Sequence, residues 1–299
     1  MGIWPLLICV FRIDIMTRNQ SLALVVVGYD SDAVLEGFFD SLRRSTVLPS
    51  HLIMVENSPV PPKLEAMKGL PIKVLHRPDN PGYGAAVNFA IASLPAVVTE
   101  VVVCNPDITI DPEAIETLLA NMENFDRTAI CGPAIFDVKG DLYPSARAIP
   151  GIRIGIGHAL LGQVWPRNPW TRRYLGDYER SETRVVGWLS GSFFVVSRKA
   201  FDEIGGFDEN YFMFFEDVDL GFRLKTWGYR SVYVPSARIT HVGAHSTSTR
   251  MKSMIKAHHR SAERFLSKLY PGRLRAPLRA ALNLGLRIRA ALASFRFEQ

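Results

Sequence analysis

The chain has 299 residues, of which 47% are hydrophobic and 10% aromatic, and this content excludes a disordered or fibrous protein. Its formal net charge is +6, with 35 basic against 29 acidic residues, and much of the excess lies after residue 249. Aromatic side chains of the kind that stack on bases are sparse in this basic tail, so we expect no nucleic-acid partner.

The N-terminal segment is expected to be an extension that precedes the folded domain. Residues 2–11 are apolar, but the run is about half as long as the ~20 residues that a membrane-spanning helix needs. It also lacks the basic flank and the small-residue cleavage site of a secretory signal. Cys9, Cys104 and Cys131 share no metal-ligand spacing, which fits a reducing cytoplasm. We therefore assign residues 1–20 to the extension and 21–245 to the main domain.

Apolar runs and helical patterns alternate from residue 22 onward. Continuous apolar stretches predict buried strands at 22–29, 52–56, 72–75 and 101–104. Helical periodicity predicts a helix over 34–42, and a run of small residues predicts another that ends near 92. Strands that alternate with helices across short turns predict an α/β fold, with a mostly parallel, Rossmann-like sheet flanked by helices.

Polar residues and glycines follow these predicted strands directly. They are Asp30, Glu56, Asn57, Asp79, Gly82, Gly84 and Asp107. Ligands of parallel sheets bind beyond the carboxyl ends of the strands, so we expect these residues to converge on one crevice. The turn at 82–84 could let backbone amides approach a phosphate. It lacks the third glycine of a dinucleotide fingerprint, however, and an ordinary turn is the alternative.

Asp107 stands directly after a buried strand and is a candidate metal ligand. A carboxylate in this place can hold a divalent cation that bridges a diphosphate, since such cations prefer hard oxygen ligands. His241 could supply an imidazole to the same metal. The alternatives are an ordinary turn at 105–107 and a packed or solvated histidine.

The strongest local pattern is the segment 211–223. Glu216, Asp217 and Asp219 follow four aromatic residues and a methionine, and so apolar an approach predicts acids that are at least partly buried. Burial raises the pKa of a carboxyl group, and a carboxylate poised in this way can take a proton from a hydroxyl nucleophile. Acids also favour the first turn of a helix, and the residues alone leave both interpretations open.

Two further regions surround this core pattern. Residues 143–187 are rich in proline, glycine, arginine and aromatics, which predicts long binding loops around a short helix, before order returns at 187–196. Residues 246–299 are predicted to form a basic, amphipathic C-terminal helical region. Its apolar side chains fall on one side at 278, 282, 288, 292 and 295, which favours a helix on an anionic membrane, with docking on the protein's own core as the alternative.

Taken in order, several of these segments resemble the family-2 glycosyltransferases with the GT-A fold. They are LVVVGY (24–29), MVENS (54–58), DNPGYGAAVN (79–88), CNPD (104–107) and FFEDVDL (214–220). The segments YPSAR (143–147), WPRNPWT (165–171), VGWLSGS (186–192), SVYVPSA (231–237) and AHST (244–247) resemble, more specifically, the actinobacterial rhamnosyltransferases. Those enzymes move L-rhamnose from dTDP-rhamnose to decaprenyl-diphosphate-GlcNAc, which builds the linker between peptidoglycan and arabinogalactan. The resemblance covers residues 22 to about 250.

The resemblance implies an inverting transferase and a role for each matching residue. Asp217 matches the catalytic base and has Glu216 beside it, while Asp107 and His241 match ligands of Mg²⁺ or Mn²⁺. Asn105 replaces the first acid of the metal motif, and Glu56 stands where relatives carry an aspartate that contacts the nucleobase. The donor-binding set implied is Tyr29, Glu56, Asn57, Gly82, Gly84, Asn88, Asn105 and Asp107.

A polyprenyl-diphosphate-linked acceptor is the partner implied on the other side of the site. Its candidate contacts are Arg147, Arg167, Arg172, Trp188, Ser190 and Gly191. Guanidinium groups pair well with phosphate oxygens, although solvated surface arginines are the alternative. The expected location is cytoplasmic, peripheral on the inner face of the plasma membrane, with association of identical chains left open.

Two other classes of protein remain as rivals. A dinucleotide-dependent oxidoreductase would account for the alternating strands and the glycine pair, but it leaves the acids at 216–219 unexplained. A catalytically silent nucleotide-sugar-binding protein is kept open by Asn105, while intact Asp107, Asp217 and His241 argue against it.

Overall fold

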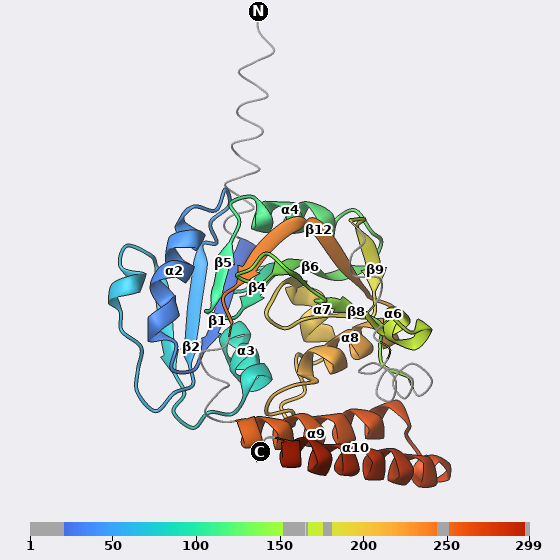
Figure 1. Cartoon of the computed structure of the whole chain (residues 1–299). Coiled ribbons are helices and arrows are strands. Elements are labelled where there is room, and N and C mark those ends of the chain that lie inside the picture. The colour runs from blue at the N-terminus through green and yellow to red at the C-terminus, as the bar shows by residue number, and fades with distance from the viewer. Residues whose placement is uncertain (1–20, 152–164, 166, 176–180, 244–250, 297–299) are drawn as a thin grey trace, which may run out of the picture.

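The computed structural model describes residues 21–151, 165, 167–175, 181–243 and 251–296 (Figure 1). The predicted N-terminal extension, residues 1–20, lies outside this part of the chain. So do parts of the predicted loops, at 152–164, 166 and 176–180.

One sheet forms the centre of the molecule, and its first half is parallel. The strands β1 (Leu22–Gly28), β2 (His51–Glu56), β3 (Ile72–His76) and β4 (Glu100–Cys104) lie in the order β3-β2-β1-β4. All seven residues of β1 are buried, as its continuous apolar sequence requires of a strand that is covered on both faces. The four predicted strands are confirmed.

The second half of the sheet is mixed, which the alternation pattern does not reveal. Strand β11 (Phe193–Ser197) lies antiparallel between β4 and β6 (Thr128–Phe136). Strand β12 (Arg230–His241) runs parallel to β6 and antiparallel to β5 (Ile108–Ile110) and β9 (Arg184–Val186), and β7 (Leu142–Tyr143) pairs with β6. The ordered segment expected at 187–196 is two strands, because β10 (Trp188–Leu189) leaves the main sheet to pair with β8 (Ala146–Arg147).

Helices cover both faces of the sheet (Figure 1). Helices α2 (Asp32–Arg43) and α4 (Ala114–Met122) pack on one face, where Leu35, Phe38 and Leu118 join the apolar side chains of alternate strand residues. Helices α3 (Tyr83–Ala92), α7 (Arg198–Glu203) and α8 (Glu216–Thr226) pack on the other. Smaller elements are η1 (Glu65–Met67) and α6 (Pro169–Leu175). The helix predicted over 34–42 is confirmed as α2.

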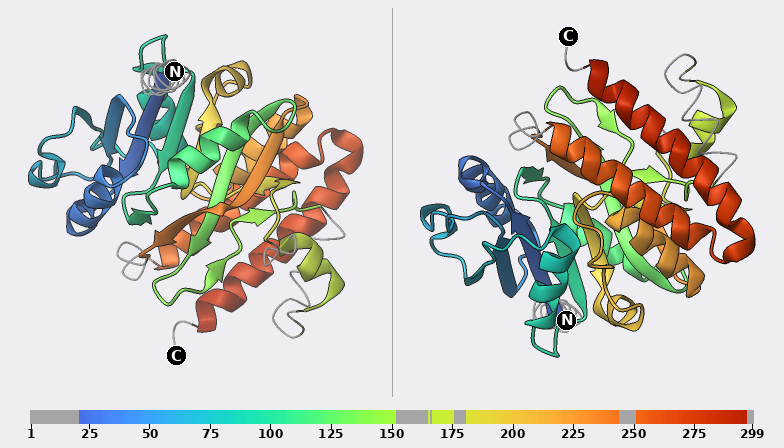
Figure 2. Two further views of the ribbon diagram at one scale, coloured as in Figure 1. Left: turned by 90° about the horizontal axis from the view of Figure 1, so that it is seen from above. Right: turned by 90° about the horizontal axis from the view of Figure 1, so that it is seen from below.

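Two long helices end the described chain. Helix α9 (Met251–Leu269) and helix α10 (Ala276–Arg296), joined through η3 (Arg273–Arg275), lie side by side along one edge of the molecule (Figures 1 and 2). Phe265 of α9 is buried in a cluster with Trp188, Tyr211 and Val218, so contacts cross the predicted boundary at residue 245. Whether 246–299 is a separate folding unit stays a prediction.

Helix α10 divides its apolar side chains between α9 and the solvent. Leu278 and Leu282 are half-buried, whereas Leu284 is 61% exposed, and Leu274 just before the helix is 98% exposed. One side of α10 therefore packs on the protein and another faces outward, and the contact of the outward side with a membrane stays a prediction. Within the described residues, no helix has the length and apolar character needed to cross a bilayer.

Candidate active site

The loop after β4 brings Asp107 to His241 at the end of β12. Strand pairing aligns His241 with Ile108, and the Val242 amide donates to the Asp107 carbonyl at 2.8 Å. The His241 Nε2 atom then lies 3.1 Å from Oδ1 of Asp107, although 134 positions separate the two residues. An oxygen and a nitrogen ligand are thus side by side at the carboxyl edge of the sheet.

Asp217 lies in the first turn of α8, against the chain that connects β10 with β11. Its Oδ2 accepts a hydrogen bond from the Gly191 amide at 3.1 Å, and its Oδ1 accepts one from the Val218 amide at 2.8 Å. The next carbonyl, that of Ser192, accepts from the Asn105 amide at 2.9 Å. The backbone at 191–192 therefore joins the Asp217 region to the loop that carries Asp107.

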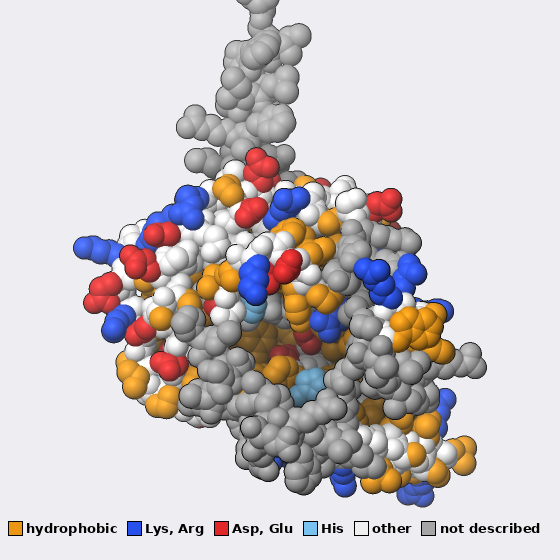
Figure 3. All heavy atoms as spheres, viewed as in Figure 1, with side chains coloured by type: hydrophobic (Ala, Val, Ile, Leu, Met, Phe, Trp, Pro, Cys, Tyr) orange, Lys and Arg blue, Asp and Glu red, His pale blue; other side chains and the backbone are white. Residues whose placement is uncertain are grey.

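Tyr83 shows that the two acidic regions face a common space. Its hydroxyl donates to the Gly191 carbonyl at 2.6 Å. Burial raises the pKa of Tyr83 well above its usual value, and the negative charges of Glu216, Asp217 and Asp107 add to this effect. Tyr83 therefore contacts the same residue, Gly191, whose amide bonds the Asp217 carboxylate. Figure 3 shows a hollow in this face of the molecule, with acidic and histidine side chains among those that line it.

The adjacent carboxyl groups of Glu216 and Asp217 differ in their surroundings. Burial and the charge of Asp217 raise the pKa of Glu216 to about 8, and its Oε2 is buried without a hydrogen-bond partner among the described residues. Burial also raises the pKa of Asp217, but the amides of Gly191 and Val218 and the charge of Arg147 oppose the rise. These surroundings favour the proton on Glu216 over Asp217, so Asp217 is the better candidate for a base.

Arg147 on β8 is held rigidly beside these acids. Its Nε donates to the Pro144 carbonyl at 2.7 Å and its Nη2 to the Tyr143 hydroxyl at 3.0 Å, while the guanidinium carbon lies 5.2 Å from the Trp188 ring centroid. Stacking on aromatic faces fixes a planar guanidinium in orientation. Arg167 and Arg172, by contrast, are exposed at and just before α6.

The other predicted acceptor contacts differ in accessibility. Trp188 is only 6% exposed, and its Nε1 donates to the Ala148 carbonyl at 3.1 Å, so it is mainly a core residue and offers little surface to an acceptor. Ser190 and Ser192 join their hydroxyls at 3.1 Å next to Gly191. Of these three residues, Gly191 is the one whose amide bonds the Asp217 carboxylate.

On the donor side, Glu56 lies at the end of β2 and is 1% exposed. Its Oε1 accepts from the amides of Asp30 and Ser58 at 3.1 and 3.0 Å, and its Oε2 accepts from the Ser31 hydroxyl at 3.1 Å. The Glu56 carboxylate thus connects the loop after β1 to the loop after β2 through hydrogen bonds. The Asn57 side chain beside it is also buried, and its Oδ1 has no partner among the described residues. Tyr29 is half-buried at the end of β1.

Gly82, Gly84 and Asn88 have structural tasks that the sequence analysis did not anticipate. Gly82 has φ +100°, and a Cβ there would stand 2.3 Å from the Phe212 carbonyl oxygen, while a Cβ on Gly84 would stand 2.8 Å from Cβ of Phe207. The Asn88 amide bonds the backbone of Phe207 through both Oδ1 and Nδ2, at 2.9 Å each. The Asn88 side chain therefore holds the segment before α8, and its contact with the donor stays a prediction.

Sequence reasoning missed three residues of this region, whereas the burial expected for Asp219 is found. Tyr83 lies between Gly82 and Gly84 and was not singled out. The sequence around Asp208 and Lys268 contains no motif that indicates a functional role. Asp219 is fully buried and bound by Arg223 at 2.6 Å and by Lys268 at 2.5 Å. Lys268 could have been found only through the helical spacing of α9, since its partner lies 49 positions away.

Comparison with known proteins identifies the family. Residues 19–263 match the model of the glycosyltransferase like family 2, and this range extends into α9. The chain is 42% identical over 282 residues to an N-acetylglucosaminyl-diphospho-decaprenol L-rhamnosyltransferase of Mycobacterium tuberculosis, covering 91% of this chain and 92% of that protein. It is 30% identical over 194 residues to the rhamnosyltransferase WbbL of Escherichia coli K12, covering 62% and 70% of the two chains.

Solved structures show the same fold at low sequence identity. The mannosyltransferase PcManGT of Pyrobaculum calidifontis, solved in complex with GDP-Man and Mn²⁺, has a TM-score of 0.57 at 12% identity, over 92% of this chain and 75% of that one. GalNAc-T7, solved with UDP, GalNAc and Mn²⁺, has a TM-score of 0.54 at 13% identity, over 91% and 55%. The match over most of the chain, the extensive identity with the mycobacterial protein and the shared architecture agree: this chain is a glycosyltransferase and belongs to family 2.

Proposed function

We propose that the protein transfers L-rhamnose from dTDP-rhamnose to a polyprenyl-diphosphate-linked GlcNAc, with inversion at the anomeric carbon. The sugar and the acceptor are inferred from the mycobacterial relative, whose sequence aligns over 91% of this chain. The observation that carries the chemistry is that the backbone of residues 191–192 bonds both the Asp217 carboxylate and Asn105, in the loop that carries Asp107. It supports a single site in which Asp107 lies on the side of the leaving group and Asp217 on the side of the nucleophile.

The proposed reaction is a single displacement. The acceptor hydroxyl oxygen attacks the anomeric carbon from the face opposite the nucleotide, and the bond from that carbon to the diphosphate oxygen breaks as the new bond forms. Asp217 receives the hydroxyl proton on its carboxylate, and the electron pair of the broken bond leaves with the nucleoside diphosphate. The amides of Gly191 and Val218 hold the carboxylate in place, which a general base requires.

Asp107 and His241 are the residues that we propose for a Mg²⁺ or Mn²⁺ ion. Among the described residues, no group of three or more His, Cys, Asp or Glu side chains is placed to hold a metal. The pair nevertheless fits a cation whose other ligands are phosphate oxygens and water, as is usual where a metal is bound together with a nucleotide. When bound, such a cation neutralises charge on the departing diphosphate.

The acceptor is proposed to approach from the side of Arg147. A guanidinium that is already stacked on Trp188 loses little conformational entropy when it pairs with a phosphate oxygen. The exposed leucines of the α10 region, Leu274 and Leu284, lie among arginines and suit an anionic lipid surface. We therefore propose a peripheral position on the membrane that holds the acceptor.

Substitution of Asp217 tests the assignment directly. Asp217→Asn keeps the shape of the side chain but removes its capacity to accept the proton, so turnover is expected to fall by at least about 10²–10⁴-fold. Nucleotide binding, measured by calorimetry with dTDP, is expected to change little. Transfer is measured with dTDP-rhamnose and a short polyprenyl-diphosphate-GlcNAc.

The matched control is Asp126→Asn, because Asp126 is exposed and lies outside the site. Near-normal turnover in Asp217→Asn would remove that residue from its role. Binding of the nucleotide sugar without transfer by the unsubstituted protein, across a panel of donors and with Mg²⁺ or Mn²⁺ present, would instead favour a silent binding protein.

A further inference from the structure

The residues that precede the catalytic acids have an unfavourable backbone conformation. Phe214 and Phe215 have φ of 65° and 64°, in the left-handed region where the Cβ of an ordinary residue crowds the following carbonyl. Such conformations persist only where the surrounding structure determines them, and they concentrate at functional sites. Here they turn the chain directly into Glu216 and Asp217 at the start of α8.

One face of α9 supplies contacts that hold this turn. The His258 ring lies 5.4 Å from the Phe214 ring and 5.3 Å from the Phe215 ring, measured between centroids. The Ser261 hydroxyl donates to the Met213 carbonyl at 2.8 Å.

Phe265 and Lys268 continue the same face of α9. The Phe265 ring lies 5.7 Å from that of Phe215. Positions 258, 261, 265 and 268 are three or four residues apart, so they share one side of the helix. Successive turns of α9 therefore contact the segment around the strained pair.

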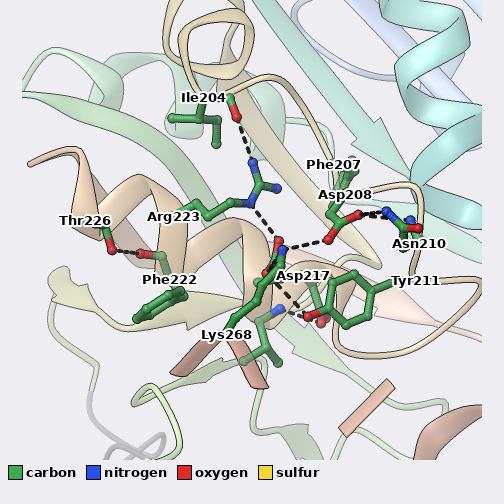
Figure 4. Close-up of polar contacts among 12 residues, drawn as sticks. Ile204, Phe207, Asp208, Asn210, Tyr211, Asp217, Phe222, Arg223, Thr226 and Lys268 are labelled. Atoms are coloured by element: carbon green, nitrogen blue, oxygen red, sulfur yellow. Dashed lines mark hydrogen bonds and ion pairs between the residues drawn. The ribbon is translucent and has the colours of Figure 1, made fainter. Parts of the chain in front are cut away.

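Lys268 connects the two ends of that segment. Its Nζ lies 2.7 Å from Oδ2 of Asp208, and both residues are labelled in Figure 4. The same Nζ lies 2.5 Å from Oδ1 of Asp219. Asp208 also pairs with Arg264 at 2.8 Å, and Asp219 with Arg223 at 2.6 Å. Each carboxylate thus has an arginine of its own, and Lys268 is not needed to neutralise either one. What it adds is a bridge between residue 208, before the strained turn, and residue 219, after it.

We propose that Lys268 is a positioning residue for Asp217, which fixes the segment 208–219 so that the Asp217 carboxylate meets the Gly191 amide. The inference deepens the proposed function, since it rests on Asp217 being the base. Helix α9 would then help to position the catalytic base, although Lys268 itself is not placed to contact the substrate.

The test uses the full chain with Lys268→Met, which keeps the length of the side chain and removes its charge. We expect kcat to fall by about 10- to 100-fold with the KM for dTDP-rhamnose changed less than about threefold, since misplacement of a catalytic group by ~1 Å costs about that much. Lys268→Arg should restore most of the loss. Lys256→Met is the matched control, because Lys256 is an exposed lysine on the same helix, and it should keep the original kcat.

A second readout does not depend on activity. The amides of Gly191 and Val218 both donate to the Asp217 carboxylate, so their hydrogen exchange reports its position. Exchange at both amides should be faster in Lys268→Met than in Lys256→Met. If Asp217→Asn kept its activity while these rates still rose, Asp217 would not be the base, although Lys268 would still be shown to fix the position of its carboxylate.

Unchanged exchange together with an unchanged kcat in folded Lys268→Met would overturn the inference. Should that variant fail to fold, Ser261→Ala provides the milder test, because it removes only the hydroxyl that bonds the Met213 carbonyl. Faster exchange at Gly191 and Val218 is expected there too. Exchange equal to that of the unsubstituted protein would count against the role of α9.

Discussion

Glu216 and Asp217 show how neighbouring carboxyl groups acquire different chemistry. Asp217 receives two backbone amides and senses Arg147, whereas Glu216 is buried with one oxygen lacking a partner among the described residues. The environment therefore favours a proton on Glu216 and a charge on Asp217. When two neighbouring carboxyl groups have different surroundings, their pKa values move apart, and one group can act as an acid while the other acts as a base.

The charge of Arg147 should set the acidic limit of activity. Asp217 must be ionised to act as a base, and a nearby cation favours the ionised form. Arg147→Met is therefore expected to raise the pKa of Asp217 further, so that the acidic limb of the kcat–pH profile shifts toward higher pH. The profile is measured with saturating donor and a short acceptor.

Arg147→Lys provides the charge-preserving comparison. It should leave the acidic limb close to its original position, even where weaker acceptor binding raises the KM. An identical profile for Arg147→Met and the unsubstituted protein would show that Arg147 does not act on the base.

Glycine at position 82 is required by the approach of helix α3 to the segment before α8. The residue has φ +100°, and a Cβ would fall 2.3 Å from the Phe212 carbonyl oxygen. Gly82→Ala is expected to lower the free energy of unfolding by about 1–3 kcal/mol, as measured by urea denaturation, and to reduce transfer as well.

Gly37→Ala is the comparison within a helix. Gly37 lies exposed in α2, and an added Cβ would meet no atom within 4 Å. Replacing glycine with alanine there should raise the free energy of unfolding by up to about 1 kcal/mol. Equal effects at the two positions would contradict the steric argument for Gly82.

Hydrophobic patterning predicted most elements of the first half of the chain. Strand β1 is buried on both sides and α2 on one, so each leaves a clear signature at Leu22–Gly28 and Asp32–Arg43. The break between β10 and β11 falls at Ser190–Ser192, but the sequence does not show that the two strands pair in different sheets, which only the fold reveals. The antiparallel placement of β11 is hidden for the same reason.

The acidic residues of the candidate site could be expected from the sequence, whereas the residues that contact them could not. The rule that ligands gather at the carboxyl ends of strands pointed to Asp107. The apolar run 211–215 pointed to the acids at 216, 217 and 219 together, and the family resemblance singled out Asp217. Tyr83 and Lys268 escaped notice because a phenol in a helix start and a lysine in a basic tail are ordinary in sequence. Their importance arises from contacts with Gly191 and Asp219, which only the folded chain brings near.

The outward side of the α9–α10 pair is where the molecule is expected to meet lipid. Leu274 and Leu284 are 98% and 61% exposed, and Arg273 and Arg275 flank the first of them. The double variant Leu274→Asp and Leu284→Asp should lose most binding to vesicles that contain anionic lipid, measured by flotation, because it replaces apolar contact with charge repulsion.

Transfer to a short, water-soluble acceptor should be unaffected by these two substitutions, since neither residue is in the site. The control is the double variant Leu48→Asp and Val60→Asp, because both residues are exposed on a different part of the surface. Equal vesicle binding by all variants would exclude the α10 region as the membrane contact.

The left-handed pair Phe214–Phe215 has a consequence for the behaviour of the enzyme on warming. A turn that is held against its own preference should open at a lower free energy than the central sheet, since local stabilities within a protein differ widely. Thermal inactivation is then expected several degrees below the calorimetric melting of the fold. Cooling from a temperature between inactivation and melting should restore full turnover, because the central sheet remains folded in that range.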